Sequence, residues 1–508
     1  MFTLIARLPL IVTLIGLGGL AMFIPALHAA LIGARVIAEV FFYFGALNLL
    51  LALFIGIALA GRARAEHPRR HLAGLAGLFV ALPFLFALPF HQAVGNTTLV
   101  NAYVEMVSSL TTTGATLFER PGRLAAPLHT WRATVGWLGG LIMWVAAIAV
   151  LAPMALGGFE VRRRAPTQEV VARGFVQITE RANLSRRVRA HAAQLLPIYV
   201  GLTLLLWVGL IVAGDTPAVA LAHAMSVLST SGISPVGGLE GGGAGWGGEM
   251  VVAGFLVFAV SRITFASETR GRGIGTVARD PEIRIALALA TLVPAFLFLR
   301  HFLGAYELEG AEMSLVEGLA TLWGSAFTVL SFLTTTGFES AGWERTQDWS
   351  GLTSPGIILI GLALIGGGVA TTAGGTKLLR VYALYQHGRR ELGRLVHPSS
   401  VAGAGREARY LRRGGAYMAW LSFMLMAFSV ALIWIAFALT GPGFEAGLVF
   451  AVAALTTTGP LASVALPEPV LYSSLTGAGK AVLTAAMILG RLETLAIVAL
   501  FSPDLWRR

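Results

Sequence analysis

The 508-residue sequence predicts an all-α membrane protein with about ten membrane crossings. The composition is the first reason: apolar residues make up 56% of the chain and charged residues 12%. Soluble proteins carry about 25% charged residues, and this chain has a mean hydropathy of +0.76. The second reason is a series of long apolar stretches, and the third is a polar motif that recurs between them.

Ten stretches are apolar and long enough to cross a bilayer, which takes about 20 residues per helix. They cover residues 2–25, 36–60, 72–92, 131–156, 192–213, 248–266, 284–304, 353–385, 414–440 and 478–502. The first could also be a signal peptide, since Arg7 precedes an apolar run that ends in small residues. We favour a retained helix because this run is longer than the apolar part of a usual signal peptide.

The composition also excludes several classes of site. The chain has no cysteine, so disulfides, zinc–thiolate sites, iron–sulfur clusters and cysteine nucleophiles are excluded. The net charge of +11 would suggest nucleic acid as a partner of a soluble protein. Here the arginines stand in loops between apolar stretches, so we expect no nucleic acid and take membrane lipid as the surroundings.

Charge predicts the orientation in the membrane. Most of the 37 basic residues follow the even-numbered stretches, whereas the opposite loops are acidic. Since basic loops remain on the cytoplasmic side, both termini are expected to be cytoplasmic. The acidic loops then face outward, where they would concentrate cations.

A polar motif recurs about every 115 residues, each time on the outward side between two long stretches. Its four copies are Thr111, Thr112, Thr113 and Gly114; Ser229, Thr230, Ser231 and Gly232; Thr334, Thr335, Thr336 and Gly337; and Thr456, Thr457, Thr458 and Gly459. Short apolar segments precede them at 99–110, 217–228, 315–333 and 446–455, and each is expected to dip into the membrane and return. One copy would be typical of a turn at a helix end, but four copies in matched positions indicate a shared site.

These residue types suit a dehydrated cation. Backbone carbonyls of converging loops can replace the ion's hydration shell without adding fixed charge. Glycine permits the backbone angles that present successive carbonyls to one axis, and threonine hydroxyls can add ligands or hold the loop. The short helices end with their carbonyls toward the site, and this partial negative charge favours cations.

The four loops resemble the filter loops of the Trk/Ktr/HKT superfamily of potassium transporters, most closely the TrkH type, and the resemblance covers nearly the whole chain. It implies a bacterial inner-membrane protein with four pseudo-symmetric helix–pore-loop–helix repeats around a central pore, preceded by two extra transmembrane helices. The implied divisions are 1–70 for the two helices and 71–190, 191–283, 284–412 and 413–508 for the repeats. Glycine in all four loops implies potassium as the transported ion, with no bound cofactor. The Ser-Thr-Ser-Gly loop and Pro460 depart from a regular threonine triplet.

Residues 364–377 interrupt a span with five glycines and three threonines. They lack the residue order of a phosphate-binding loop. Close helix packing through small residues is one interpretation, and an unwound stretch lining a cavity is the other. The resemblance implies the second, a gate below the filter, formed here by Gly366, Gly367, Gly368, Thr371, Thr372, Gly374, Gly375 and Lys377.

Arg491 is a charged residue inside the last apolar stretch, where charge is costly and usually faces a partner or the protein interior. One interpretation is an Arg491–Glu493 pair near the membrane edge. The resemblance implies another, in which Arg491 lies in the pore beside the gate segment.

The resemblance further implies a homodimer and a separate cytoplasmic nucleotide-binding regulatory protein of the TrkA type. Two alternatives remain within the superfamily: a symporter coupled to sodium or protons, and a weakly selective cation channel. An unrelated secondary transporter would be expected to have inverted repeats, whereas these repeats run parallel. An enzyme would need acids or histidines converging within the spans, and the sequence suggests none.

Overall fold

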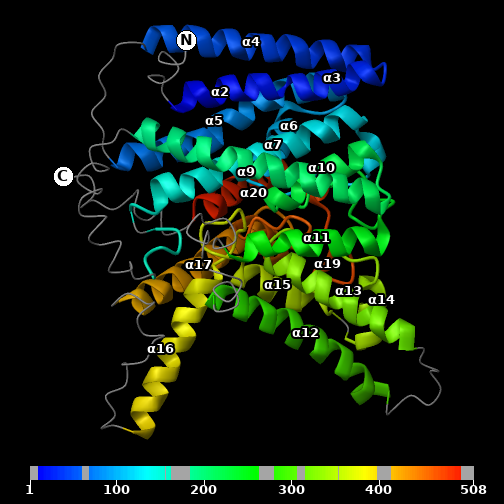
Figure 1. Cartoon of the computed structure of the whole chain (residues 1–508), viewed down its shortest axis with the longest axis vertical. Coiled ribbons are helices and arrows are strands. Elements are labelled where there is room, and N and C mark those ends of the chain that lie inside the picture. Colours follow the sequence, from blue (N-terminus) through cyan, green and yellow to red (C-terminus); the bar gives the residue numbers. More distant parts are fainter. Residues whose placement is uncertain are drawn as a thin grey trace.

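The computed structural model describes residues 10–59, 68–154, 156–161, 184–261, 280–305, 315–352, 354–397 and 414–493. Within these ranges every regular element is helical (Figure 1). Among the described residues, seven helices are long and apolar enough to cross a membrane. The other three predicted crossings fall on α11 (Gly245–Val260), α15 (Gly356–Ile365) and α20 (Gly477–Leu492), and the ends of two of these stretches, 262–266 and 494–502, lie outside the described residues.

The first predicted span is longer at its carboxyl end than expected. It consists of α2 (Leu10–Ala21) and α3 (Phe23–Leu31), which pack along α4 (Arg35–Leu59) at one edge of the molecule (Figure 1). A Cβ at Gly19 would lie 3.1 Å from the carbonyl oxygen of Gly45, so the two glycines allow the helices to approach closely. The described part of this span runs to Leu31 and not to residue 25, because the chain turns only at Gly33, which has a φ of +80°.

The remaining helices form four units, in each of which the helix before a polar motif (the short helix) packs against one helix that precedes it and one that follows the loop. The units are α5 (Pro68–Val94), α6 (Leu99–Leu110) and α7 (Ala126–Ala146); α9 (Leu184–Ala213), α10 (Pro217–Ser229) and α11; α12 (Pro281–Ala305), α13 (Leu315–Leu333) and α15; and α17 (Gly415–Ala438), α18 (Phe444–Leu455) and α20. The short helices are α6, α10, α13 and α18.

Contacts between units close a cycle. Helix α7 packs on α10, α11 on α13, α15 on α18, and α20 on α6. Smaller elements lie within the units: η1 (Pro121–Arg123), the π-helix η2 (Ala147–Leu151) that continues α7, α14 (Trp343–Ser350), α19 (Leu461–Val464) and η7 (Tyr472–Ser474). Helix α16 (Leu378–Val396) extends away from the body of the molecule (Figure 1).

Glycine lets the second long helix of a unit touch the end of the short helix. A Cβ at Gly139 on α7 would lie 2.0 Å from the carbonyl oxygen of Leu110, and one at Gly490 on α20 would lie 2.3 Å from that of Leu455. No side chain fits at such a distance, since real Cβ contacts are longer and a backbone carbonyl cannot swing aside. These two contacts seat the first and fourth short helices against their units.

We predict that Gly139→Ala destabilises the protein by about 1–3 kcal/mol, because the added methyl group overpacks a backbone contact. The melting temperature of the detergent-solubilised protein measures this. Gly74→Ala on α5 is the matched control, since nothing lies within 4 Å of a Cβ at that position. Equal melting temperatures for the two variants would contradict the packing described.

Candidate functional site

The four polar motifs follow the four short helices and share one backbone conformation. In the first loop, Thr112 donates its N–H to the carbonyl of Ser109 (2.9 Å), and Thr113 donates to that of Ser108 (2.8 Å). The other three loops repeat these two bonds, which form the Schellman closure of a helix. The second residue of each motif is left-handed: Thr112 (φ 54°), Thr230 (52°), Thr335 (56°) and Thr457 (55°). Glycine usually occupies this position, and a β-branched residue there is strained.

Hydroxyl groups brace each loop from within. The first and third side chains of each motif bond to each other, at 2.8 Å for Thr111–Thr113, 3.0 Å for Ser229–Ser231, 3.1 Å for Thr334–Thr336 and 3.1 Å for Thr456–Thr458. The first hydroxyl also donates to the carbonyl four residues earlier, as Thr111 does to Val107 at 2.8 Å. Serine replaces threonine in the second loop without changing this pattern. The hydroxyls of these positions therefore hold the loop shape.

The loops touch one another and close a ring, through backbone atoms at three junctions and through the Pro460 side chain at the fourth. A Cβ at Gly114 would lie 2.0 Å from the carbonyl oxygen of Ser231, and one at Gly232 would lie 2.4 Å from that of Thr336. A Cβ at Gly337 would lie 3.0 Å from Pro460 Cγ. A Cβ at Gly459 would lie 2.1 Å from the backbone nitrogen of Ala115. The N–H of Gly459 also donates to the carbonyl of Thr113 at 2.5 Å. Each loop thus contacts the next, and the fourth contacts the first.

The ring joins two features that favour a cation. Four helices direct their carboxyl ends, and with them partial negative charge, toward the loops. The loop residues themselves carry no charge and are buried, except that Gly114 and Gly232 are half-buried. Such a ring offers backbone oxygens in place of water, without a fixed charge that would hold an ion permanently.

The predicted gate segment is unwound between α15 and α16 and folds back on itself. The N–H groups of Thr376 and Lys377 donate to the carbonyls of Leu364 and Ile365, both at 2.9 Å. A Cβ at Gly366 (φ 73°) would lie 2.2 Å from the carbonyl oxygen of Gly374, so the two limbs of the segment touch through their backbones. Packing of intact helices through small residues is therefore the wrong interpretation of this stretch.

This segment lies against the ends of three of the four loops. The N–H of Gly374 donates to Thr335 Oγ1 at 2.7 Å, and Thr372 Oγ1 donates to the carbonyl of Leu228 at 3.2 Å. A Cβ at Gly374 would lie 2.1 Å from the carbonyl oxygen of Thr456. The segment thus reaches the second, third and fourth units at the level where their short helices end.

The other glycines and threonine of the segment contact its surroundings. The N–H of Gly368 donates to the carbonyl of Ala259 at 3.0 Å, and a Cβ at Gly367 would lie 2.7 Å from the same oxygen. Thr371 donates to the carbonyl of Gly368 at 2.8 Å. The segment is therefore also fixed to the end of α11.

Arg491 bonds to the gate segment and not to Glu493. Its Nη1 donates to the carbonyl of Thr372 at 2.7 Å, and the residue is 3% exposed. Its Nε and Nη2 have no hydrogen-bond partner among the described residues, and the side chain borders a small cavity beneath the segment. The alternative of an Arg491–Glu493 pair is wrong for this structure, because Glu493 Oε2 bonds to Arg380 Nη2 at 2.9 Å.

The pairing of Arg380 with Glu160 in this cluster escaped the sequence analysis. Arg380 Nε lies 2.6 Å from Glu160 Oε1, and Lys377 Nζ donates to the carbonyl of Ala373. Arg380, Glu160 and Glu493 are far apart in sequence, so spacing gives no sign that they meet. Their meeting places a buried ion-pair cluster directly beside the end of the gate segment.

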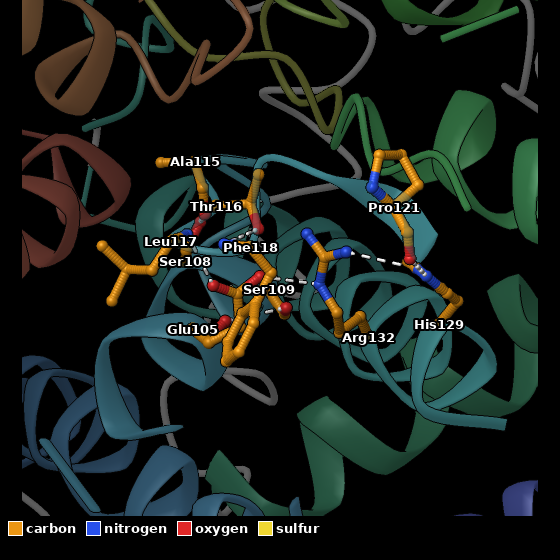
Figure 2. A network of polar contacts seen from close by, with 10 residues as sticks. All are labelled: Glu105, Ser108, Ser109, Ala115, Thr116, Leu117, Phe118, Pro121, His129 and Arg132. Carbon is orange, nitrogen blue, oxygen red and sulfur yellow. Dashed lines mark hydrogen bonds and ion pairs between the residues drawn. The ribbon is translucent and has the colours of Figure 1, made fainter. Parts of the chain in front are cut away.

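Another missed residue is Glu105, which the charge pattern assigns to the acidic outer loops. The structure buries it on α6, with 1% exposed, 2.7 Å from Arg132 Nε (Figure 2). A buried charge needs a partner, and that partner comes from the next helix. The pair lies behind the first loop of the ring.

Glu339 follows the third loop and faces α19, where Ser463 Oγ donates to it at 3.3 Å. The pKa of this carboxyl is raised to about 7, mainly by burial, while the Ser463 hydrogen bond lowers it and the charge of Glu240 raises it. Glu339 therefore changes charge near neutral pH, close to the ring.

Comparison with known proteins relates the chain to TrkH and other Trk system proteins. Residues 287–508 match the family model of TrkH, described as a cation transport protein. The Trk system potassium uptake protein TrkH of Salmonella typhimurium is 29% identical over 432 residues, covering 84% of this chain and 82% of the relative. The protein TrkI of the same system from Halomonas elongata is 27% identical over 447 residues, covering 85% and 81%.

The fold is also that of a solved structure. The crystal structure of the potassium transporter TrkH from Vibrio parahaemolyticus superimposes with a TM-score of 0.80 and 23% identity, covering all of both chains. This likeness confirms the all-helical, multi-span membrane fold predicted from the sequence.

We predict that rubidium uptake into proteoliposomes falls about two- to threefold as the outside pH is lowered through 7, because protonation removes the charge of Glu339 beside the ring. Glu339→Gln should give the low rate at every pH. Glu445→Gln, an exposed acid on the same side, should keep the wild-type profile. A profile unchanged by Glu339→Gln would contradict the role of this carboxyl.

Proposed function

Because residues 287–508 match the family model of the TrkH cation transport proteins, we propose that the chain takes up potassium ions through a channel-like pore whose filter is the ring of four loops. It is a transport protein and not an enzyme. The observation that carries the proposal is the ring itself, in which four loops of one conformation touch one another in sequence, the fourth touching the first. A negative cell interior favours inward flow by about 2.3 kcal/mol per charge per 100 mV.

In this proposal the backbone of Gly114, Gly232, Gly337 and Gly459, with the three residues before each, forms the potassium-binding filter. The hydroxyl bonds within each loop support it, since they fix the backbone that presents the carbonyls. No resident cofactor is part of this mechanism, and potassium is the cargo. The repeats expected at 71–190, 191–283, 284–412 and 413–508, after the two helices of 1–70, are kept in this proposal, with the starts of the first three moved to those of α5, α9 and α12 at residues 68, 184 and 281.

Residues 366–377 are the gate in this account. Their bonds to Thr335 and to the carbonyl of Leu228 support a closed position directly at the ends of the short helices. Arg491 holds the segment through the carbonyl of Thr372 and brings a positive charge to the cavity, where it repels cations. Opening then requires the segment to leave these partners.

We further propose the surroundings that the Trk relatives suggest. The protein works in the bacterial inner membrane with both termini in the cytoplasm, as a homodimer under a nucleotide-binding TrkA-type regulator. The relatives support this by their names, since they are components of a Trk system. Two alternatives to selective potassium uptake are a symporter coupled to sodium or protons and a weakly selective cation channel. A flux experiment distinguishes them.

The filter predicts a selectivity change for Gly114→Ser. Gly114 has a φ of +74° and no room for a Cβ, so a serine must displace the first loop from the second. We expect the ratio of rubidium to sodium uptake into proteoliposomes to fall about tenfold, which corresponds to about 1.4 kcal/mol. Gly122→Ser, where nothing lies within 4 Å of a Cβ, should retain the wild-type ratio.

An equal uptake of both ions by the wild-type protein would show a weakly selective channel, and sodium- or proton-dependent rubidium uptake would show a symporter. A wild-type ratio in Gly114→Ser would mean that the filter lies elsewhere.

The gate predicts increased basal uptake for Gly374→Ala. The methyl group would press on the carbonyl of Thr456 and push the segment away from the ring. Overpacking of about 1–3 kcal/mol against the closed position should raise rubidium uptake in the absence of a regulator roughly tenfold. Gly361→Ala on α15 meets nothing within 4 Å and is the control. Basal uptake that stays at the wild-type level in Gly374→Ala would exclude the segment as the barrier.

A further inference from the structure

One position recurs behind the ring, six residues before the first residue of each motif. It is occupied by Glu105, His223, Thr328 and Phe450. All four are buried, with at most 1% exposed, and each lies on a short helix. The segment that follows each loop is here called its return strand, although it is not a β-strand, and spans 115–121, 233–238, 338–342 and 460–472 in the four units. This position faces the return strand in every unit.

In the first unit the position carries charge (Figure 2). Glu105 Oε2 accepts the N–H of Leu117 at 3.0 Å, and Oε1 lies 2.7 Å from Arg132 Nε. Arg132 in turn lies 3.4 Å from His129 Nδ1, and His129 Nε2 lies 2.9 Å from the carbonyl oxygen of Pro121. The network therefore ties both ends of the return strand to α6 and α7.

In the second and third units the same position binds through neutral or weakly basic groups. His223 Nε2 lies 2.9 Å from Ser234 Oγ, and its Nδ1 lies 3.3 Å from Asp215 Oδ2. Thr328 Oγ1 accepts the N–H of Ser340 at 3.2 Å. Ser340 and Leu117 are both six residues after the first residue of their motifs, so Thr328 and Glu105 hold equivalent N–H groups.

A second carboxylate reinforces the third loop from the neighbouring unit. Glu249 on α11 is 2% exposed and accepts bonds from Ser340 Oγ (2.8 Å), the N–H of Ala341 (2.8 Å) and Trp323 Nε1 (2.8 Å). It therefore joins the return strand of the third unit to a helix of the second.

The fourth unit has an apolar residue at this position and reaches the loop differently. The ring of Phe450 packs on that of Tyr472, with centroids 5.0 Å apart. The Tyr472 hydroxyl donates to the carbonyl of Gly459 at 2.8 Å. The same position thus supports the loop in all four units, through an ion pair, a histidine, a threonine and a tyrosine-bearing aromatic contact.

We propose that these groups are positioning residues for the filter, with the Glu105–Arg132 pair as the principal one. This rests on the proposed function of the ring. Backbone carbonyls discriminate between ions of similar size only if the loops hold their places, and the return strands are the ends by which they are held. Loss of one partner of a buried ion pair is costly, because the other charge stays buried and unpaired.

The test is Glu105→Gln, which keeps the shape of the side chain and an acceptor for Leu117 but removes the charge that pairs with Arg132. The ratio of rubidium to sodium uptake by the full-length protein in liposomes should fall about tenfold. Asn48→Leu is the control, since Asn48 is buried at 5% exposure on α4 and, within the described part of the chain, bonds to Met22 and to no other side chain. It should retain the wild-type ratio, which separates loss of filter geometry from general destabilisation.

Thr328→Val is the second variant, because it removes a single hydroxyl at nearly constant volume and should fold even where Glu105→Gln does not. We expect a fall in the ratio of about two- to threefold, the effect of one neutral hydrogen bond. Wild-type ratios in both variants would overturn the positioning role while leaving the filter intact. A wild-type protein that does not distinguish rubidium from sodium would instead overturn the proposed function itself.

Discussion

Backbone-to-backbone contact between neighbouring loops is the constraint on which the structure of this protein depends. At Gly114 and Gly232 a carbonyl oxygen of the next loop occupies the place of a side chain. At Gly459 the backbone nitrogen of Ala115, directly after the first loop, occupies that place. Four short helices can therefore end around one point only if their loops carry glycine there. The same requirement appears one layer outward, where Gly139 and Gly490 let whole helices rest on the last carbonyls of α6 and α18. A cycle of helix contacts results, from α7–α10 around to α20–α6.

The gate segment depends on this ring for its position. It is held by a hydroxyl of the third loop, a carbonyl at the end of α10 and close contact with the fourth loop. It therefore contacts three of the four units. Below it, Arg380 pairs with Glu160 and Glu493, and Arg491 bonds through one nitrogen to the carbonyl of Thr372. Since unpaired buried charges are expensive, a shift of the segment must exchange these partners together. Helix α16 continues from the segment out of the body of the molecule, which gives a route from the surface to this cluster (Figure 1).

The sequence predicts the fold class because hydropathy and a repeated motif are local signals. The short helices at 99–110 and 315–333 and the loops after them were found from the pattern alone. Contacts between distant segments carry no such signal. Arg380, Glu160 and Glu493 stand in unrelated stretches, and Glu105 is one acid among several on the outer side until the fold buries it beside Arg132. The strain of Thr112 and its three equivalents is also invisible, since threonine at a left-handed position contradicts the local preference. Tertiary packing outweighs that preference at these four positions.

The central claim is that the four loops surround one cation site. The most direct measurement is the anomalous diffraction of rubidium in crystals of the protein grown with rubidium in place of potassium. The account predicts density on the axis enclosed by Gly114, Gly232, Gly337 and Gly459, within about 3 Å of backbone carbonyl oxygens. Rubidium density elsewhere in the protein, with none inside the ring, would contradict it.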